Sequence, residues 1–235
     1  IVESFDKMPF CKHYREQKHQ VCNNIFVKST MYYCQLDEGL WVMLSNLHFK
    51  KTVLMRNLYD ENLPLDYHFI NIHVKATRVV NKSLVNGMLL KNQTWSLFKA
   101  GKALTEYHFK NSEEKNVTIF FTSKWLEQQK KRDPKYQKSK LSDFFDSDND
   151  SLILDDTQMI YEDICDQLMA LANDGVDKNE HLIREWTTTI LNNFIEKLDA
   201  NVDSENHFKL SDKDQKNIQL AEQFLNNHLF GDFPG

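Results

Sequence analysis

The first half of the chain consists of short apolar runs separated by polar turns. These runs are rich in β-branched and aromatic side chains, which is typical of β-strands. They lie at residues 40–44, 52–55, 67–74, 95–98, 106–109 and 116–121. Clusters of Asp, Asn, Gly and Lys separate them, and a tight turn is expected at residues 100–102. Many short strands with no helix between them predict an antiparallel β-sandwich or a small β-barrel.

In the second half, apolar residues recur every three or four positions, which is the spacing of an amphipathic helix. The first predicted helix begins near Asp155 or Asp156 and ends before Gly175. A longer helix runs from about Asn179 to Ala200 and has a wide apolar stripe. A third helix is expected to begin at Ser211, a favourable N-cap residue, and to end before Gly231.

These patterns predict an α+β protein whose β-domain comes first. We expect a β-domain at residues 1–127, a polar linker at 128–156, a helical region at 157–210 and a further helix within 211–235. The charge pattern supports a boundary, because residues 110–140 hold nine Lys or Arg and four acids, whereas 141–177 hold eleven acids and no Lys or Arg.

The apolar stripe of the long predicted helix has two interpretations. It either covers the β-domain or the preceding helix, or it forms the interface of a two-fold symmetric homodimer. The candidate interface residues are Trp186, Ile190 and Phe194.

Composition is that of an ordinary soluble protein, with 41% hydrophobic and 27% charged residues. No apolar run approaches the roughly 18 to 20 residues that cross a bilayer, and the first residues lack the pattern of a signal peptide. We therefore expect a cytoplasmic protein without membrane contact. The four cysteines, Cys11, Cys22, Cys34 and Cys165, form no CxxC pair, so we expect reduced thiols and no zinc site.

Sequence motifs for common chemistry are missing. The chain has no GxGxxG, GxxxxGK[ST], HExxH or GxSxG motif. This argues against the dinucleotide-binding, P-loop, zinc-protease and serine-hydrolase classes that these motifs mark. The net charge of -5 argues against nonspecific binding of nucleic acid by the whole chain. Strand alternation places His68 and His73 on opposite faces, so they are not expected to share a metal. We predict no metal and no cofactor.

Two charged runs resemble binding motifs only in part. Asp146, Asp148 and Asp150 match the start of a calcium loop, but Ser151 and Thr157 stand where that loop needs Gly and Glu. We interpret this run as a solvated acidic loop. Residues 130–132, Lys-Lys-Arg, are followed by acidic residues and a proline, which favours a solvated loop over a phosphate site.

The aromatic residues of the β-domain provide a candidate ligand site. Most of them are expected to form the core, but a small barrel can also hold one small ligand in its mouth. Polar residues among them would orient that ligand. The candidate ligand-binding residues are Trp41, Tyr67, Phe69, Asn71, His73, Trp95, Glu106 and Tyr107.

The C-terminal segment resembles a known family. Residues 213–229 read KDQKNIQLAEQFLNNHL and are followed by Phe233 and Pro234. This segment resembles the opening of the DNA-binding domain of AraC-family transcription regulators, and its apolar residues Ile218, Ala221, Phe224 and Leu225 match the buried face of the first helix there. Residues 37–43, 67–71 and 120–126 also look like parts of the sensory domain of such regulators.

The resemblance implies a cupin-like β-barrel, a helical region that dimerises and a C-terminal domain that reads DNA. This chain would then be the effector-sensing and dimerisation region of a regulator, without enzyme activity. Its partners would be an unknown small-molecule effector, a second copy and, in the intact protein, operator DNA. The recognition helices would follow Gly235, so we do not expect this chain to bind operator DNA specifically. The alternatives are a cupin-type metal-dependent enzyme and a protein-interaction module without a small ligand.

Overall fold

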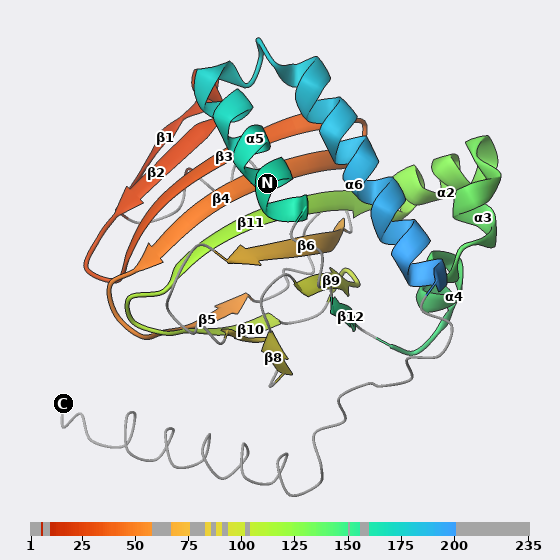
Figure 1. The fold of residues 1–235 in the computed structure, drawn as a ribbon, viewed down its shortest axis with the longest axis horizontal. Coiled ribbons are helices and arrows are strands. Elements are labelled where there is room, and N and C mark those ends of the chain that lie inside the picture. The colour runs from red at the N-terminus through yellow and green to blue at the C-terminus, as the bar shows by residue number, and fades with distance from the viewer. Residues whose placement is uncertain are drawn as a thin grey trace, which may run out of the picture.

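The structure is a computed structural model, and it describes residue 6 and residues 10–57, 67–75, 83–85, 88–90, 94–101, 104–149, 151–155 and 160–200. Within these residues the β-strands come first and the long helices last (Figure 1). The predicted α+β class with antiparallel strands is confirmed.

Most strands belong to one antiparallel sheet of eight strands, the large sheet, in the order β1-β2-β3-β4-β11-β6-β9-β12. Their bounds are β1 (Cys11–Tyr14), β2 (His19–Asn23), β3 (Val27–Asp37), β4 (Leu40–Phe49), β11 (Glu113–Thr122), β6 (Tyr67–Lys75), β9 (Thr94–Phe98) and β12 (Ser151–Asp155). A single 3-10 turn, η1 (Arg15–Gln17), joins β1 to β2. The described strands β1 and β12 end the large sheet without pairing to each other, so it is open rather than closed.

A second antiparallel sheet, the small sheet, has four strands in the order β5-β10-β7-β8. Its strands are β5 (Val53–Asn57), β10 (Leu104–His108), β7 (Ser83–Val85) and β8 (Met88–Leu90). Every strand predicted from the sequence therefore falls on an observed one, in β4, β5, β6, β9, β10 or β11. The expected turn at residues 100–102 is also present at Ala100 and Gly101, where Gly101 has a φ of 83°.

The turn between β3 and β4 depends on a glycine. Gly39 has a φ of 80°, a conformation that other residues rarely adopt. Its carbonyl accepts a 2.9 Å hydrogen bond from Thr122 N, and a Cβ at this position would run into Thr122 Oγ1. Thr122 in turn caps the next helix by accepting from Trp125 N at 3.1 Å. The turn therefore fixes the point where β11 ends and the chain becomes helical.

The large sheet has two different faces, because neighbouring side chains of a strand point to opposite sides. One face, here the helix-covered face, carries buried apolar residues: Cys34, Val42, Leu44, Ile70, Ile72, Trp95, Leu97, Val117, Ile119 and Phe121. The long helices α5 (Ile160–Gly175) and α6 (Glu180–Ala200) pack on this face (Figure 1). We call the opposite face the polar face.

Helix α6 is part of the protomer core. Phe194 has no exposed surface, and its ring stacks on the equally buried Trp95 with centroids 5.7 Å apart. Ile190 is 1% exposed, whereas Trp186 is partly buried at the edge of the core. Of the three candidate dimer residues, Ile190 and Phe194 are therefore covered by their own chain and offer no surface to a partner. The stripe therefore covers the β-domain at these two positions, and an interface at Trp186 stays a prediction.

The segment 128–156 differs from the polar linker that the sequence predicts. It contains the end of α2 (Ser123–Arg132), then α3 (Pro134–Lys138), α4 (Lys140–Asp146) and β12, which pairs with β9 at the edge of the large sheet. Tyr136, Leu141 and Phe144 of this segment are buried. The sequence allowed either a mobile loop or a solvated helix for residues 128–140, and the structure has helices there. The buried apolar residues anchor the segment, which corrects the expectation of a polar linker. The helix predicted from Ser211 lies outside the described residues.

The cysteines also correct an expectation. Antiparallel pairing of β1 with β2 sets Cys11 directly opposite Cys22, with Cα atoms 4.2 Å apart, and the two form a disulfide. They were expected to be reduced thiols. Cys34 and Cys165 are free and buried, and burial raises the pKa of the Cys34 thiol to about 11. Disulfides persist mainly in oxidising compartments, so this pair does not support the cytoplasmic location expected from the sequence.

Candidate functional site

Polar side chains gather on the polar face of the large sheet. Seven of them are buried there, at 0% to 7% exposure: Gln20, Ser29, Ser45, His73, Ser96, Glu114 and Thr118. Burying polar groups costs free energy unless hydrogen bonds compensate. A sheet face that is merely part of a core would carry apolar residues, as the helix-covered face does. The polar face is therefore the candidate site.

Hydrogen bonds connect the residues at the centre of this face. His73 Nδ1 lies 2.7 Å from Asn116 Oδ1, and these residues are directly opposite each other on β6 and β11. Thr118 Oγ1 donates to Asn71 Oδ1 at 3.0 Å, and Ser96 Oγ donates to the Asn71 carbonyl at 3.3 Å. Because Asn116 Oδ1 only accepts, this pairing places the His73 proton on Nδ1 and leaves Nε2 as an acceptor.

Aromatic rings lie beside this polar centre. Phe69 stacks on Phe98 at 4.8 Å between centroids and contacts Phe120 at 5.8 Å. The ring centroids of Trp41 and Tyr33 lie 6.4 Å apart. Within the described part of the chain, the indole nitrogen of Trp41 is buried and has no hydrogen-bond partner. Polar groups between aromatic rings are a common composition of small-molecule sites.

A chain of hydrogen bonds continues the polar face towards its β1 edge. Tyr33 Oη lies 2.7 Å from His13 Nε2, and His13 Nδ1 lies 2.6 Å from Asp6 Oδ1. Asp6 also pairs with Arg15. Hydrogen bonds from Arg15 and His13 lower the pKa of Asp6 to about 2, so this pairing weakens as the pH falls from the ordinary carboxylate range towards 2. Burial raises the pKa of Tyr33.

At the other end, the polar face meets the small sheet. The Nδ1 atom of His108, in β10, lies 2.9 Å from Glu114 Oε1 in β11. Both residues are buried. Ser112 Oγ also donates to Glu114, at 3.4 Å. The ring of Phe49 stacks on His108 with centroids 4.1 Å apart. These contacts hold the two sheets together.

The structure brings only some of the predicted ligand residues together. Trp41, Phe69, Asn71 and His73 share the polar face, and Tyr67 lies partly buried where that face ends at Thr122. Trp95 belongs to the helix-covered face and is fully buried against Phe194, which removes it from the site.

The two predicted residues of β10 lie on the small sheet. Glu106 is partly buried, and strand alternation puts it on the same face as His108. Tyr107 pairs with Leu54 and Leu84, and its side chain lies outside the described residues. The sequence did not single out Asn116, Thr118, Ser96, Tyr33 or His13.

Metal ligands do not converge in the described residues, where no group of three or more His, Cys, Asp or Glu is placed to hold an ion. The prediction that His68 and His73 face opposite ways is confirmed, because His68 contacts Phe121 whereas His73 bonds Asn116. Asp146 ends α4, and Asp150 lies outside the described residues. Lys130 pairs with Glu127 at 2.9 Å on α2, so the basic run is helical rather than a loop.

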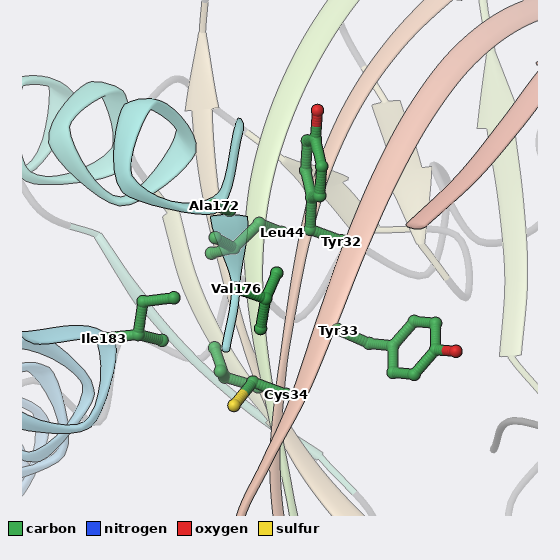
Figure 2. Close-up of a pocket in the computed structure, with 8 residues that line it drawn as sticks. Tyr32, Tyr33, Cys34, Leu44, Ala172, Val176 and Ile183 are labelled. Atoms are coloured by element: carbon green, nitrogen blue, oxygen red, sulfur yellow. The ribbon is translucent and has the colours of Figure 1, made fainter. Parts of the chain in front are cut away.

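A small gap lies between the large sheet and the long helices (Figure 2). Apolar residues of both layers border it, including Cys34, Val42, Ala172, Val176 and Ile183. In Figure 2 the Tyr33 side chain points away from the helices, as expected for the polar face. The gap has no space for a water molecule, so it is a packing defect of the core rather than a ligand site.

None of the described helices has the length and apolar character needed to cross a membrane.

Comparisons with known proteins find only distant likenesses. No protein-family model matches the sequence, and no curated protein matches it. The solved structure of the 7S globulin of Momordica charantia is 9% identical to this chain, with a TM-score of 0.32. The match covers 48% of this chain and 34% of the globulin, so this chain spans about a third of the globulin's length. The AraC-like transcriptional activator CuxR is 10% identical with a TM-score of 0.37, covering 88% of this chain and 67% of that one.

A third solved structure is the EutQ protein of Clostridium difficile, at 11% identity and a TM-score of 0.27, covering 43% of this chain and 68% of EutQ. Likenesses this distant identify neither a family nor an activity.

Proposed function

We propose that the polar face binds a small, oxygen-rich molecule and that this chain is the effector-sensing region of an AraC-type regulator. The observation that carries the proposal is the partly buried hydrogen-bonding centre around Asn71, His73 and Asn116 between aromatic rings. The sequence resemblance of residues 213–229 to the start of an AraC-type DNA-binding domain supports the regulatory role.

The unused hydrogen-bonding groups indicate the chemistry of the ligand. Asn71 and Asn116 accept through their side-chain oxygens, and within the described residues their NH₂ groups donate no hydrogen bond. Together with the indole N–H of Trp41 they offer donors, while His73 Nε2 offers an acceptor. A ligand with several carbonyl or hydroxyl oxygens and at least one O–H satisfies this set. A purely apolar ligand would leave the buried indole N–H of Trp41 unpaired, which disfavours such ligands.

Replacing Asn71 by alanine is expected to weaken ligand binding about tenfold or more, because one or two hydrogen bonds to the ligand are lost. A thermal-shift screen of neutral monosaccharides, their uronic acids and nucleosides would first identify a ligand that raises Tm. Titration calorimetry would then compare Asn71→Ala with the wild-type chain. Asn46→Ala is the matched control, since Asn46 is an exposed residue of β4. Equal affinity of Asn71→Ala and wild type would exclude the polar face as the binding site.

We propose a binding role rather than a catalytic one. His68 Nε2 and Ser123 Oγ lie 2.8 Å apart, as a base and a nucleophile would. However, His68 Nδ1 accepts a 2.9 Å hydrogen bond from Ala100 N, which fixes the ring proton on Nε2. Nε2–H therefore donates to Ser123 and cannot take the serine proton. This tautomer disfavours hydrolase chemistry at the pair and supports the proposal.

We also propose that the chain forms a homodimer, as the resemblance implies. Static light scattering over a concentration series is expected to reach twice the chain mass of 27.9 kDa. Ile190 and Phe194 are buried within the protomer, so a dimer would use other residues. A constant monomer mass up to high micromolar concentration would contradict this proposal and leave the ligand site unaffected.

A further inference from the structure

A second hollow lies on the helix-covered side of the large sheet, away from the proposed effector site. It is a cleft of about 420 Å3 between α2, α4 and the turn that follows β9. The lining residues are His68, Lys99, Ala100, Gly101, Ser123, Leu126, Glu127, Lys130, Phe145 and Asp146. Ligand sites of proteins commonly have volumes of about 300 to 1,000 Å3. The cleft therefore has room for a small metabolite.

The hydroxyl of Ser123 offers a hydrogen-bond donor to this cleft. His68 donates Nε2–H to Ser123 Oγ, because its Nδ1 is occupied by the Ala100 N–H. The Ser123 proton must then point away from His68, and Ser123 Oγ donates no hydrogen bond to another described residue. Ser123 is also the first residue of α2, where backbone N–H groups favour an anionic ligand group.

The charges around the cleft leave one unpaired group of each sign. Lys130 and Glu127 neutralise each other across 2.9 Å. The Lys99 ammonium lies 4.9 Å from the centre of the Phe144 ring and donates to the Ser147 carbonyl. Among the described residues, it has no carboxylate within ion-pair distance.

Asp146, at the end of α4, is the remaining charged group of the lining. In the described part of the chain, its carboxylate forms no ion pair. The cleft therefore presents a cation with a hydroxyl donor and, separately, an anion.

An apolar wall completes the cleft. Leu126 is 3% exposed, and the partly buried Phe145 sets its ring edge-on to His68 with centroids 4.5 Å apart. An aliphatic or aromatic group of a ligand can lie against this wall without displacing a hydrogen bond.

We propose that this cleft binds a small zwitterion of the free amino acid class. The ligand carboxylate pairs with Lys99 and the Ser123 hydroxyl, the ammonium pairs with Asp146, and the side chain lies against Leu126 and Phe145. This site is distinct from the polar face, because His68 and Phe69 of the same strand point to opposite sides of the sheet. The inference stands independently of the proposed effector site.

Titration calorimetry on the full chain tests this proposal with each of the twenty standard amino acids. For the tightest binder, the matching amine and the matching carboxylic acid are titrated as well; for leucine these are isopentylamine and 4-methylpentanoate. Both analogues are expected to bind about tenfold more weakly or worse, since each lacks one charge-assisted contact. An analogue that binds as tightly as the amino acid would overturn the zwitterion assignment.

Two variants locate the site. Lys99→Met keeps the apolar stem beside Phe144 but removes the charge, and Asp146→Asn removes the anion. Each is expected to lose about tenfold in affinity, whereas the exposed controls Lys138→Met and Asp148→Asn keep the wild-type value. Asn71→Ala should also leave amino acid binding unchanged, which separates this result from the test of the effector site. If no amino acid binds, or if both cleft variants bind normally, the proposal is wrong.

Discussion

Replacing Phe194 by alanine is expected to lower the free energy of unfolding by about 3–5 kcal/mol, the usual cost of removing a fully buried aromatic ring. Phe194 has no exposed surface and stacks on Trp95 across the contact between α6 and the large sheet. Equilibrium urea denaturation followed by tryptophan fluorescence measures the effect, because Trp95 reports on this contact.

The matched control is Leu182→Ala at a partly buried position near the start of α6. It is expected to cost less than about 1.5 kcal/mol, since much of the side chain is already in contact with water. A loss below about 1 kcal/mol for Phe194→Ala would mean that α6 is not part of the protomer core. The helix would then be free to serve as a separate dimerisation element.

Replacing Glu114 by alanine is expected to cost about 1–3 kcal/mol for each of the two buried donors that lose their acceptor, the usual penalty for an unpaired buried polar group. The truncation leaves His108 Nδ1 and the Ser112 hydroxyl without their acceptor between the two sheets. Urea denaturation monitored by circular dichroism measures the loss.

Glu113→Ala is the control, because Glu113 precedes Glu114 in the sequence but its carboxylate is exposed. Glu113 Oε1 lies 3.4 Å from His48 Nδ1 on the surface. Surface pairs contribute about 0 to 1 kcal/mol, so the control should change stability little. Equal losses in the two variants would show that the Glu114 contact does not hold the sheets together.

The sequence predicted the strands that combine apolar alternation with clear turns, such as β4, β6 and β11. It missed β3, because residues 27–37 mix Lys, Ser, Thr and Gln with the buried Tyr32, Cys34 and Leu36. It also missed β12, where three apolar residues lie inside an acidic stretch. Pairing with β9 selects that strand, and a partner distant in the sequence leaves no local signal.

The candidate site was predicted in part. Alternation correctly separated His68 from His73, and the candidates Phe69, Asn71 and His73 do share one face. Trp95 was wrongly included because alternation within one strand does not say which face meets the helices. The pairing register between β6 and β9 shows which face Trp95 is on, since it sets Ser96 rather than Trp95 opposite Asn71. The contact of His13 with Tyr33 depends on the pairing of three strands, so no spacing rule would have found it.

The position of β11 has a consequence for how the chain folds during synthesis. β11 lies between β4 and β6 at the middle of the large sheet, although it is made long after β4. Until residue 122 has left the ribosome, the β3–β4 hairpin exposes an unpaired edge to the cell. Such edges recruit other strands, and pairings between distant segments form slowly. Chaperones that cover extended strands are therefore expected to matter most while residues 50–122 are being translated.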